Sequence, residues 1–247
     1  MIRQYYRPKT MEEALSLLQQ AGAFPLGGGT VLTNLQREED IIAVDLQELG
    51  LGQIEVRGNS VEIGARVTLQ QLMEWEGCPD DLRKALWLEA PLNLRNMATL
   101  AGTIVSCDGR SPLVTALLGL DARLTRYEER QPQEMQLGDF LPFRPRGLIT
   151  AITLPVKVRF AFEYVARTPA DIPIVCVALT RWPSGRTRLT LGGWGDHPRL
   201  AMDGPQAEGI ELAARNAFYH AEDERASAEY RREIAAVLAR RALEKLE

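Results

Sequence analysis

The string PLGGGTVLTN at residues 25–34 is the stretch of the chain that is most informative about its fold. It places Gly27, Gly28 and Gly29 between a short apolar run and Thr30, from which a helical turn can begin. Residues without a Cβ atom let the backbone approach a ligand closely, and their N–H groups can converge on an anion such as a diphosphate. A tight corner between a strand and a turn uses the same residues, so this string alone leaves both readings open.

A second small-residue stretch lies further along the chain, in RNMATLAGTIVSCDGRSPLVTALLGLDA at residues 95–122. Here Gly102 stands between the hydroxylated residues Thr99 and Thr103, which suits a second contact between backbone and phosphate. A core strand that contains one glycine is the alternative reading. Neither stretch contains a P-loop or a GxGxxG pattern, so neither signals a nucleotide site by itself.

Taken together, the two stretches resemble the two flavin loops of the FAD-binding (medium) subunits of molybdenum hydroxylases, the xanthine dehydrogenase and carbon monoxide dehydrogenase flavoprotein family. The family has Ala-Gly-Gly followed by Thr, Ser or His in the first loop and Arg-Asn-x-Ala-Thr-Ile-Gly-Gly-Asn in the second. Residues 5–18, 191–201 and 227–243 also look like counterparts of family segments. The resemblance therefore covers nearly the whole chain in one order.

The resemblance implies an α+β fold of a particular type. Residues 1–157 would form a two-subdomain FAD-binding fold of the PCMH (vanillyl-alcohol oxidase-like) type, with subdomains at about 1–52 and 53–157. Residues 158–247 would form a smaller α+β C-terminal domain of the kind found in molybdenum hydroxylase flavoproteins.

The resemblance also implies a cofactor site, in which the backbone amides of both stretches hold the pyrophosphate of FAD between them. The implied cofactor-binding residues are Gly27, Gly28, Gly29, Thr30, Val31, Thr99, Gly102, Thr103, Ser106, Leu148 and Asp171. Leu148 would pack beside the flavin, and Asp171 matches a family aspartate near the flavin side of the C-terminal domain. For Asp171, a solvated turn residue before Pro173 is an equally good reading. No side chain is assigned as an acid, base or nucleophile, because flavin chemistry belongs to the cofactor.

The sequence departs from the family pattern at three positions. Ala101 replaces a glycine, so its methyl group is expected to crowd the phosphate, and Thr103 replaces an asparagine. Pro112 stands where relatives usually have an aspartate that hydrogen-bonds the cofactor. These departures support the alternative of a flavin-free structural subunit. A free-standing flavin oxidoreductase, such as the enzyme that reduces UDP-N-acetylenolpyruvoylglucosamine, is a third reading.

In the family, electrons pass from a large subunit with a molybdenum cofactor, through a small [2Fe-2S] subunit, to FAD and then to an external acceptor. The resemblance implies these two partners, and an oxidoreductase subunit on which the organic substrate does not react. A net charge of −4 gives no general attraction to nucleic acid or to anionic lipid.

The cysteines and histidines exclude other kinds of site. Cys78, Cys107 and Cys176 form no CxxC pair and are expected to be small buried side chains, and His197 and His220 have no carboxylates at ligand spacing near them. No apolar run approaches the roughly 20 residues of a membrane span, and the first residues lack the apolar core of a secretory signal. We therefore expect no metal site, no membrane span and a cytoplasmic protein.

Local patterns predict the following elements. Helices are expected at residues 10–22, 68–73, 82–88, 113–118 and 229–246, strands at 23–26, 41–46 and 148–154, a hairpin at 54–63, and C-terminal strands at 160–166, 173–180, 188–193 and 191–201. Capping boxes start the first two helices, and Ser111 and Pro112 start the fourth. The last helix is expected to bury the face that carries Ile234, Leu238 and Arg241 together with Val237 and Leu243.

Overall fold

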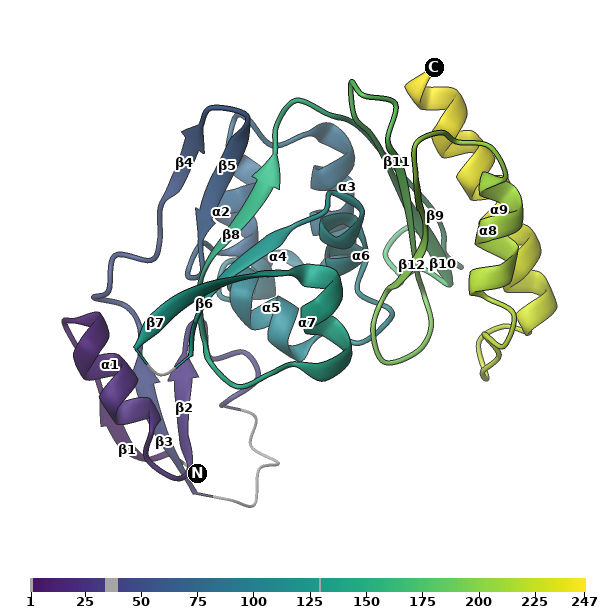
Figure 1. The fold of residues 1–247 in the computed structure, drawn as a ribbon. Coiled ribbons are helices and arrows are strands. Elements are labelled where there is room, and N and C mark those ends of the chain that lie inside the picture. Colours follow the sequence, from purple (N-terminus) through teal and green to yellow (C-terminus); the bar gives the residue numbers. More distant parts are fainter. Residues whose placement is uncertain (1, 34–39, 129) are drawn as a thin grey trace.

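The computed structural model describes residues 2–33, 40–128 and 130–247. Within these residues the strands form three sheets, which follow one another along the chain (Figure 1). The first two sheets and the helices that fall among their strands along the chain make up the N-terminal part of the molecule. The third sheet and the last two helices make up the C-terminal part.

The first sheet is small and parallel, with strand order β1-β3-β2. Its elements are β1 (Ile2–Tyr6), α1 (Met11–Leu18), β2 (Ala23–Leu26) and β3 (Ile41–Asp45). Thr10 caps α1 as predicted, since its side chain accepts a hydrogen bond from the Glu13 N–H at 3.2 Å. The helix ends four residues before the predicted stop at Gly22. Because β2 ends at Leu26, the glycine stretch begins directly at the end of a strand.

The second sheet is antiparallel and has strand order β4-β5-β8-β6-β7. Its strands are β4 (Ile54–Arg57), β5 (Ser60–Gly64), β6 (Arg123–Glu128), β7 (Gln131–Gln136) and β8 (Leu148–Pro155). The predicted hairpin at 54–63 is confirmed, with Ile54 paired to Ile63 and Val56 to Val61. The β6–β7 pair has no counterpart in the sequence prediction, because its polar strands lack clear alternation.

A group of helices packs against this sheet. They are α2 (Leu69–Glu74), α3 (Asp80–Glu89), α4 (Leu92–Arg95), α5 (Leu100–Ser106), α6 (Pro112–Gly119) and α7 (Leu137–Phe143). These helices and the second sheet enclose a hydrophobic core, the first core of the molecule. Every residue of α6 is buried, so this helix lies at its centre. Its start is as predicted: Ser111 accepts a hydrogen bond from the Val114 N–H at 3.1 Å, and Pro112 occupies the first turn.

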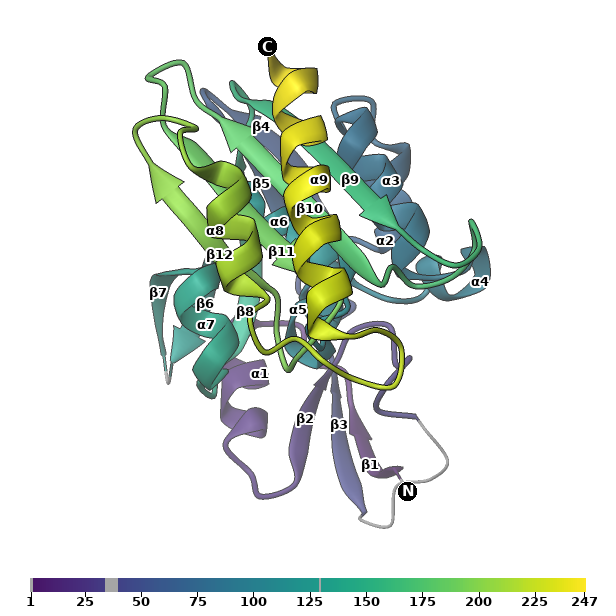
Figure 2. The same ribbon diagram turned by 90° about the vertical axis from the view of Figure 1, so that its right-hand side faces the viewer.

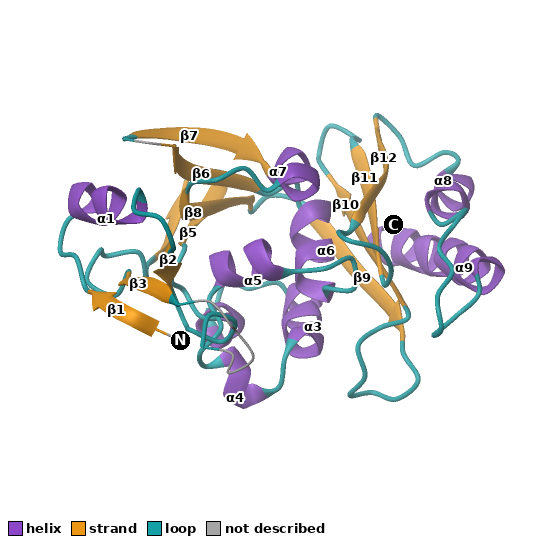
Figure 3. Ribbon diagram, turned by 90° about the horizontal axis from the view of Figure 1, so that it is seen from below, coloured by secondary structure: helices purple, strands orange, loops and turns teal. Residues whose placement is uncertain are grey.

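The third sheet is an antiparallel meander that is covered on both faces. It contains β9 (Arg159–Val165), β10 (Val175–Arg181), β11 (Thr187–Gly192) and β12 (Arg199–Gly204), followed by α8 (Ile210–Ala217) and α9 (Ala228–Leu246). Helices α8 and α9 lie across one face (Figure 2), whereas α3 and α6 lie on the other (Figure 3). Cys176 and Ala178 of β10 therefore belong to the first core, and Val177 and Leu179 belong to a second core under α8 and α9.

Two structural expectations are wrong, wholly or in part, and one alternative reading does not hold. Part of the second stretch forms helix α5, because the Thr99 side chain caps a helix there, so the alternative of a core strand is excluded. Residues 191–201 are the end of one strand, a turn and the start of another, since β11 ends at Gly192 and β12 begins at Arg199. Helix α9 buries Leu238 and packs Ile234 and Leu243 against the second core as expected, but Arg241 is exposed. Most of its buried residues are alanines, which let the helix approach the sheet closely.

The cysteine prediction is confirmed, because Cys78, Cys107 and Cys176 are all buried free thiols. Burial raises the pKa of Cys78 to about 11 and the pKa values of Cys107 and Cys176 to about 12. Among the described residues there is no helix long and apolar enough to cross a membrane. Nor does that part of the chain contain a group of three or more His, Cys, Asp or Glu side chains that could hold a metal ion.

An ion-pair network on the third sheet predicts a pH dependence of stability. Asp203 on β12 accepts hydrogen bonds from Arg186 at 2.6 Å and from Arg188 at 2.5 Å. The hydrogen bond from Arg186, with that from Arg188, holds the pKa of the Asp203 carboxyl below its usual value. The ionised carboxylate thus stabilises the fold above the unfolded pKa of about 3.9, and this contribution is lost as the pH falls through the lower folded pKa.

We expect Asp203→Asn to lower the melting temperature at pH 7. The difference in melting temperature between the variant and the unmodified protein is expected to shrink below pH ~4. Thermal unfolding followed by circular dichroism across this range checks the prediction, and a difference independent of pH would contradict it.

Candidate functional site

The structure brings the two small-residue stretches together. A Cβ atom at Gly28 would overlap the carbonyl oxygen of Met97, and one at Gly27 would lie 2.8 Å from Oγ1 of Thr99. The second stretch is itself anchored, because the Ala98 carbonyl accepts from the Leu69 N–H at 3.0 Å. Both glycines are therefore needed for the backbone of the first stretch to lie against the second.

The first stretch presents a run of unused backbone donors. Gly29 has φ +76, and its carbonyl oxygen accepts from both the Thr33 N–H at 3.1 Å and the Thr33 hydroxyl at 2.6 Å, which closes one turn. Within the described part of the chain, no hydrogen bond is found for the backbone N–H groups of residues 27–30. Gly27, Gly28 and Gly29 are half-buried and Thr30 is exposed, so this segment lies at the surface, where an anionic ligand can approach it.

The second stretch has its backbone donors already engaged. The Leu100 N–H donates to the Val67 carbonyl at 2.9 Å, and the Gly102 N–H donates to Oγ1 of Thr99 at 3.2 Å. The N–H groups of Ala101 and Thr103 are likewise bonded, at 3.3 and 2.9 Å, to backbone carbonyls. The expectation that amides of both stretches converge on a diphosphate is therefore not met, because the second stretch starts a helix and its amides satisfy that helix start.

Helix α5 instead offers an open surface beside the first stretch. Gly102 and Ser106 lie one helical turn apart and are both exposed, and space remains open around the Cα of Gly102 except toward Thr99. The hydroxyl of Thr103 donates to the Thr99 carbonyl at 3.1 Å, and that of Ser106 donates to the Gly102 carbonyl at 2.8 Å. These hydroxyl groups therefore have acceptor lone pairs available, while their donors are used within the helix.

The structure also places the other two departures from the family pattern, Ala101 and Pro112. Ala101 packs against the first core, so its methyl group does not crowd the exposed side of α5. Pro112 is buried in the first turn of α6. At the same helix start, the Glu89 carboxylate accepts hydrogen bonds from the Ser111 hydroxyl at 2.7 Å and from the Leu113 N–H at 3.0 Å. Burial raises the pKa of Glu89.

Glu89 is a residue that sequence reasoning missed. It lies at the end of α3 and meets Ser111 only when α3 and α6 pack together. No local motif marks such a pairing. The acidic group near Pro112 therefore comes from another helix and caps α6.

Two other predicted residues lie apart from this arrangement. Leu148 is 3% exposed and packs with Leu15 and Leu46 between the first and second sheets, so its side chain is part of the core. Asp171 is exposed, and its carboxylate accepts from the Thr168 N–H at 3.2 Å. This is the geometry of a turn residue in solvent. Neither residue is placed in the candidate site, which consists of Gly27, Gly28, Gly29, Thr30, Val31, Thr99, Gly102, Thr103 and Ser106.

The Thr99 side chain stabilises the start of α5 in this site. It caps α5 through the Gly102 N–H and lies beside Gly27. We expect Thr99→Ala to destabilise the protein by about 1 kcal/mol, because the cap is lost, and Thr99→Ser to restore most of it. Chemical denaturation of the two variants checks this, and equal destabilisation by serine and alanine would contradict the capping role.

Comparison with known proteins gives one family match and several relatives that cover almost the whole chain. Residues 1–157 match the family described as the FAD binding domain in molybdopterin dehydrogenase. The chain is 29% identical over 246 residues to the uncharacterized protein YgfM of Escherichia coli K12, covering 96% of this chain and 94% of that protein. It is also 29% identical over 276 residues to the carbon monoxide dehydrogenase medium chain of Afipia carboxidovorans, covering 98% and 95% of the two chains.

Solved structures agree with this assignment. The fold matches a chain of the reconstituted CO dehydrogenase from Oligotropha carboxidovorans with a TM-score of 0.82 and 26% identity, over 98% of this chain and 96% of that one. The expected fold of the PCMH type is thereby confirmed. From the matched domain and the full-length relatives, we conclude that this chain belongs to the family of FAD-binding domains of molybdopterin dehydrogenases.

Proposed function

We propose that this chain is the FAD-binding, electron-transfer subunit of a molybdenum hydroxylase. The observation that carries the proposal is the run of unengaged N–H groups at residues 27–30, which lies against the start of α5. Such a row of backbone donors fits the pyrophosphate of a dinucleotide, because several N–H groups can point at the same anion without a Cβ in between. Family membership supplies the identity of the dinucleotide.

The residues present fit FAD in two further respects. Gly102 leaves open space on the exposed side of α5, and Ser106 lies on the same side. The departure that raised the strongest steric objection, Ala101, turns its methyl group toward the core. When bound, FAD supplies the electron transfer itself, and the chain's own groups bind and orient it. We take residues 1–157 as the cofactor-binding domain and 158–247 as the C-terminal domain.

The proposal includes two partner chains, a large subunit with the molybdenum cofactor and a small [2Fe-2S] subunit. Its support is that the relative from Afipia carboxidovorans is named as the medium chain of its enzyme, which means that other chains accompany it. A surface suited to a partner lies next to the site: Leu92, Leu94 and Met97, in α4 and just after it, are 55%, 42% and 53% exposed. A cytoplasmic location is part of the same proposal.

The absorption spectrum of the purified chain, before and after incubation with FAD, tests the proposal. We expect flavin bands that remain with the protein through gel filtration. A colourless protein that cannot be reconstituted would overturn the flavoprotein assignment and favour the flavin-free structural subunit. Co-expression with candidate large and small subunits of a molybdenum hydroxylase then tests the complex: co-purification with molybdenum and iron is expected, and a flavoprotein without either metal would indicate a free-standing oxidoreductase.

A further inference from the structure

We propose that the C-terminal domain acts as a clamp on residues 107–111, the segment after α5, and that Arg231 is a positioning residue which sets α5 for the cofactor through this clamp. The proposal rests on the proposed function, since it concerns the same site. It assigns a binding role to a part of the chain that lies outside the matched cofactor domain.

The first part of the clamp is a pair of hydrogen bonds between Gly109 and the glycine turn at residues 193–195. The Gly109 N–H donates to the Gly195 carbonyl at 2.8 Å, and the Gly193 N–H donates to the Gly109 carbonyl at 2.7 Å. A Cβ atom at Gly109 would overlap the carbonyl oxygen of Trp194 and lie 2.6 Å from that of Gly195. The segment after α5 is therefore bonded in both directions to the turn between β11 and β12, at a distance that only glycine permits.

Arg231, in the first turn of α9, completes the clamp. Its side chain is 0% exposed, and its Nη1 donates to the Gly193 carbonyl at 2.9 Å. Its Nη2 donates to Asp223 at 2.6 Å, and the other oxygen of Asp223 accepts from Arg110 at 3.2 Å. One buried guanidinium thus connects the glycine turn and Arg110, the neighbour of Gly109. Burying a charge is costly unless it is paired and hydrogen-bonded. The two hydrogen bonds of Arg231 therefore hold the Gly193 carbonyl and Asp223 in defined positions relative to each other.

A second arginine joins the same two parts. Nη2 of Arg144 donates to the Cys107 carbonyl at 2.6 Å and to the Asp196 carbonyl at 3.1 Å. Cys107 is the C-cap residue of α5, and Asp196 follows the glycine turn. The end of α5 is therefore held to the C-terminal domain at two independent places.

The position of α5 depends on such contacts because the helix has only 7 residues. Isolated helices of this length are not stable, so packing and end contacts decide where the helix lies. Its start is fixed by the hydrogen bond from Leu100 to Val67, and its end is fixed by the clamp. Ser106 is at the clamped end, so its position relative to Gly28 is set by Arg231 and Gly109.

Arg231→Met tests the proposal, because methionine keeps the apolar stem and removes both hydrogen bonds. We expect the dissociation constant for FAD to rise about tenfold or more, since small displacements of positioning groups have effects of this size. The visible circular dichroism of the bound flavin is expected to change, which a loss of stability alone would not cause. Arg240→Met on the same helix is the matched control, because its side chain is 53% exposed and its ion pair with Glu244 is long, at 3.9 Å.

Further variants keep the test decisive if Arg231→Met does not fold. Arg110→Gln removes the ion pair between Arg110 and Asp223. Because the Arg110 side chain is 33% exposed, this change is milder for folding, and we expect it to weaken FAD binding as Arg231→Met does. Arg231→Lys, which can reach one partner but not both, is expected to give partial rescue.

The two proposals fail in different ways. If the unmodified chain does not bind FAD, the proposed function fails. If it binds FAD but Arg231→Met and Arg110→Gln bind with unchanged affinity and an unchanged flavin dichroism spectrum, the clamp is wrong and the proposed function stands. Hydrogen exchange of the amides in α5, measured on the FAD-free protein, gives a readout independent of the cofactor: faster exchange is expected in Arg231→Met, and equal exchange would count against the clamp.

Discussion

Gly28→Val is expected to abolish FAD retention while the protein still folds. The sequence suggests that the branched side chain would occupy the space of the phosphate, but the structure gives a different reason. A Cβ at this position overlaps the Met97 carbonyl, which is backbone and cannot rotate away. The two stretches must separate, and the row of N–H groups at residues 27–30 then loses its position beside α5. The ratio of flavin to protein after gel filtration measures the effect.

The matched control for this experiment is Gly52→Ala. Gly52 has nothing within 4 Å of an added Cβ, so the substitution adds a Cβ to a glycine without a clash. We expect unchanged flavin content in this variant. Full flavin occupancy in Gly28→Val, with a normal unfolding transition, would show that the contact between the two stretches is not required for binding.

Phe162→Ala is expected to destabilise the protein by about 3–5 kcal/mol, the usual cost of removing a buried phenylalanine. Phe162 is 1% exposed and lies on β9, yet its side chain belongs to the first core with residues of α3 and α6. Its backbone N–H also donates to Asp81 of α3 at 3.1 Å. The third sheet and the cofactor domain thus share one core, so we expect a single cooperative unfolding transition at lower denaturant concentration.

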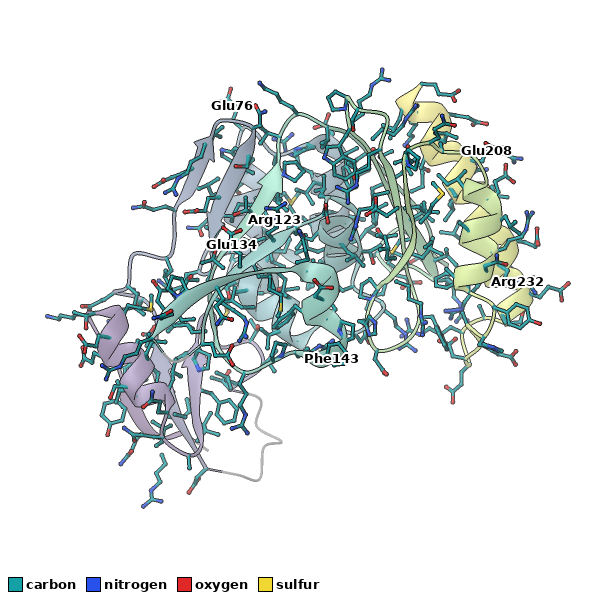
Figure 4. The ribbon with its side chains drawn as sticks, in the orientation of Figure 1. Glu76, Arg123, Glu134, Phe143, Glu208 and Arg232 are labelled. Carbon is teal, nitrogen blue, oxygen red and sulfur yellow. The ribbon has the colours of Figure 1, made fainter. Side chains whose placement is uncertain are left out.

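Phe143→Ala provides the control for the loss of an aromatic ring. Phe143 ends α7 and is 83% exposed, at the rim of the molecule in Figure 4. The change in unfolding free energy is expected to stay within about 0.5 kcal/mol, as for most surface substitutions. Two separate transitions in Phe162→Ala, or equal effects of the two substitutions, would contradict a shared core.

Local signals in the sequence predicted much of the fold. Thr10, Thr68 and Ser111 mark helix starts because a cap needs only a side-chain oxygen a few residues from a free N–H. The hairpin at 54–63 follows from alternation around a turn, which is also a short-range property. Tertiary packing decided what these signals do not encode, including the polar strands β6 and β7 and the alanine-rich buried face of α9.

The family of the chain and the two small-residue stretches of the candidate site can be recognised from glycine spacing and family motifs, because these are properties of neighbouring residues. How the two stretches are used depends on tertiary packing. The structure shows that the unengaged amides belong to the first stretch, that Ala101 faces the core and that Leu148 is a core residue. Glu89, Arg144 and Arg231 act on partners far away in the chain, and their geometry exists only once the helices and sheets have packed. Hydrogen bonds between distant segments leave no local pattern, which is why sequence reasoning could not find them.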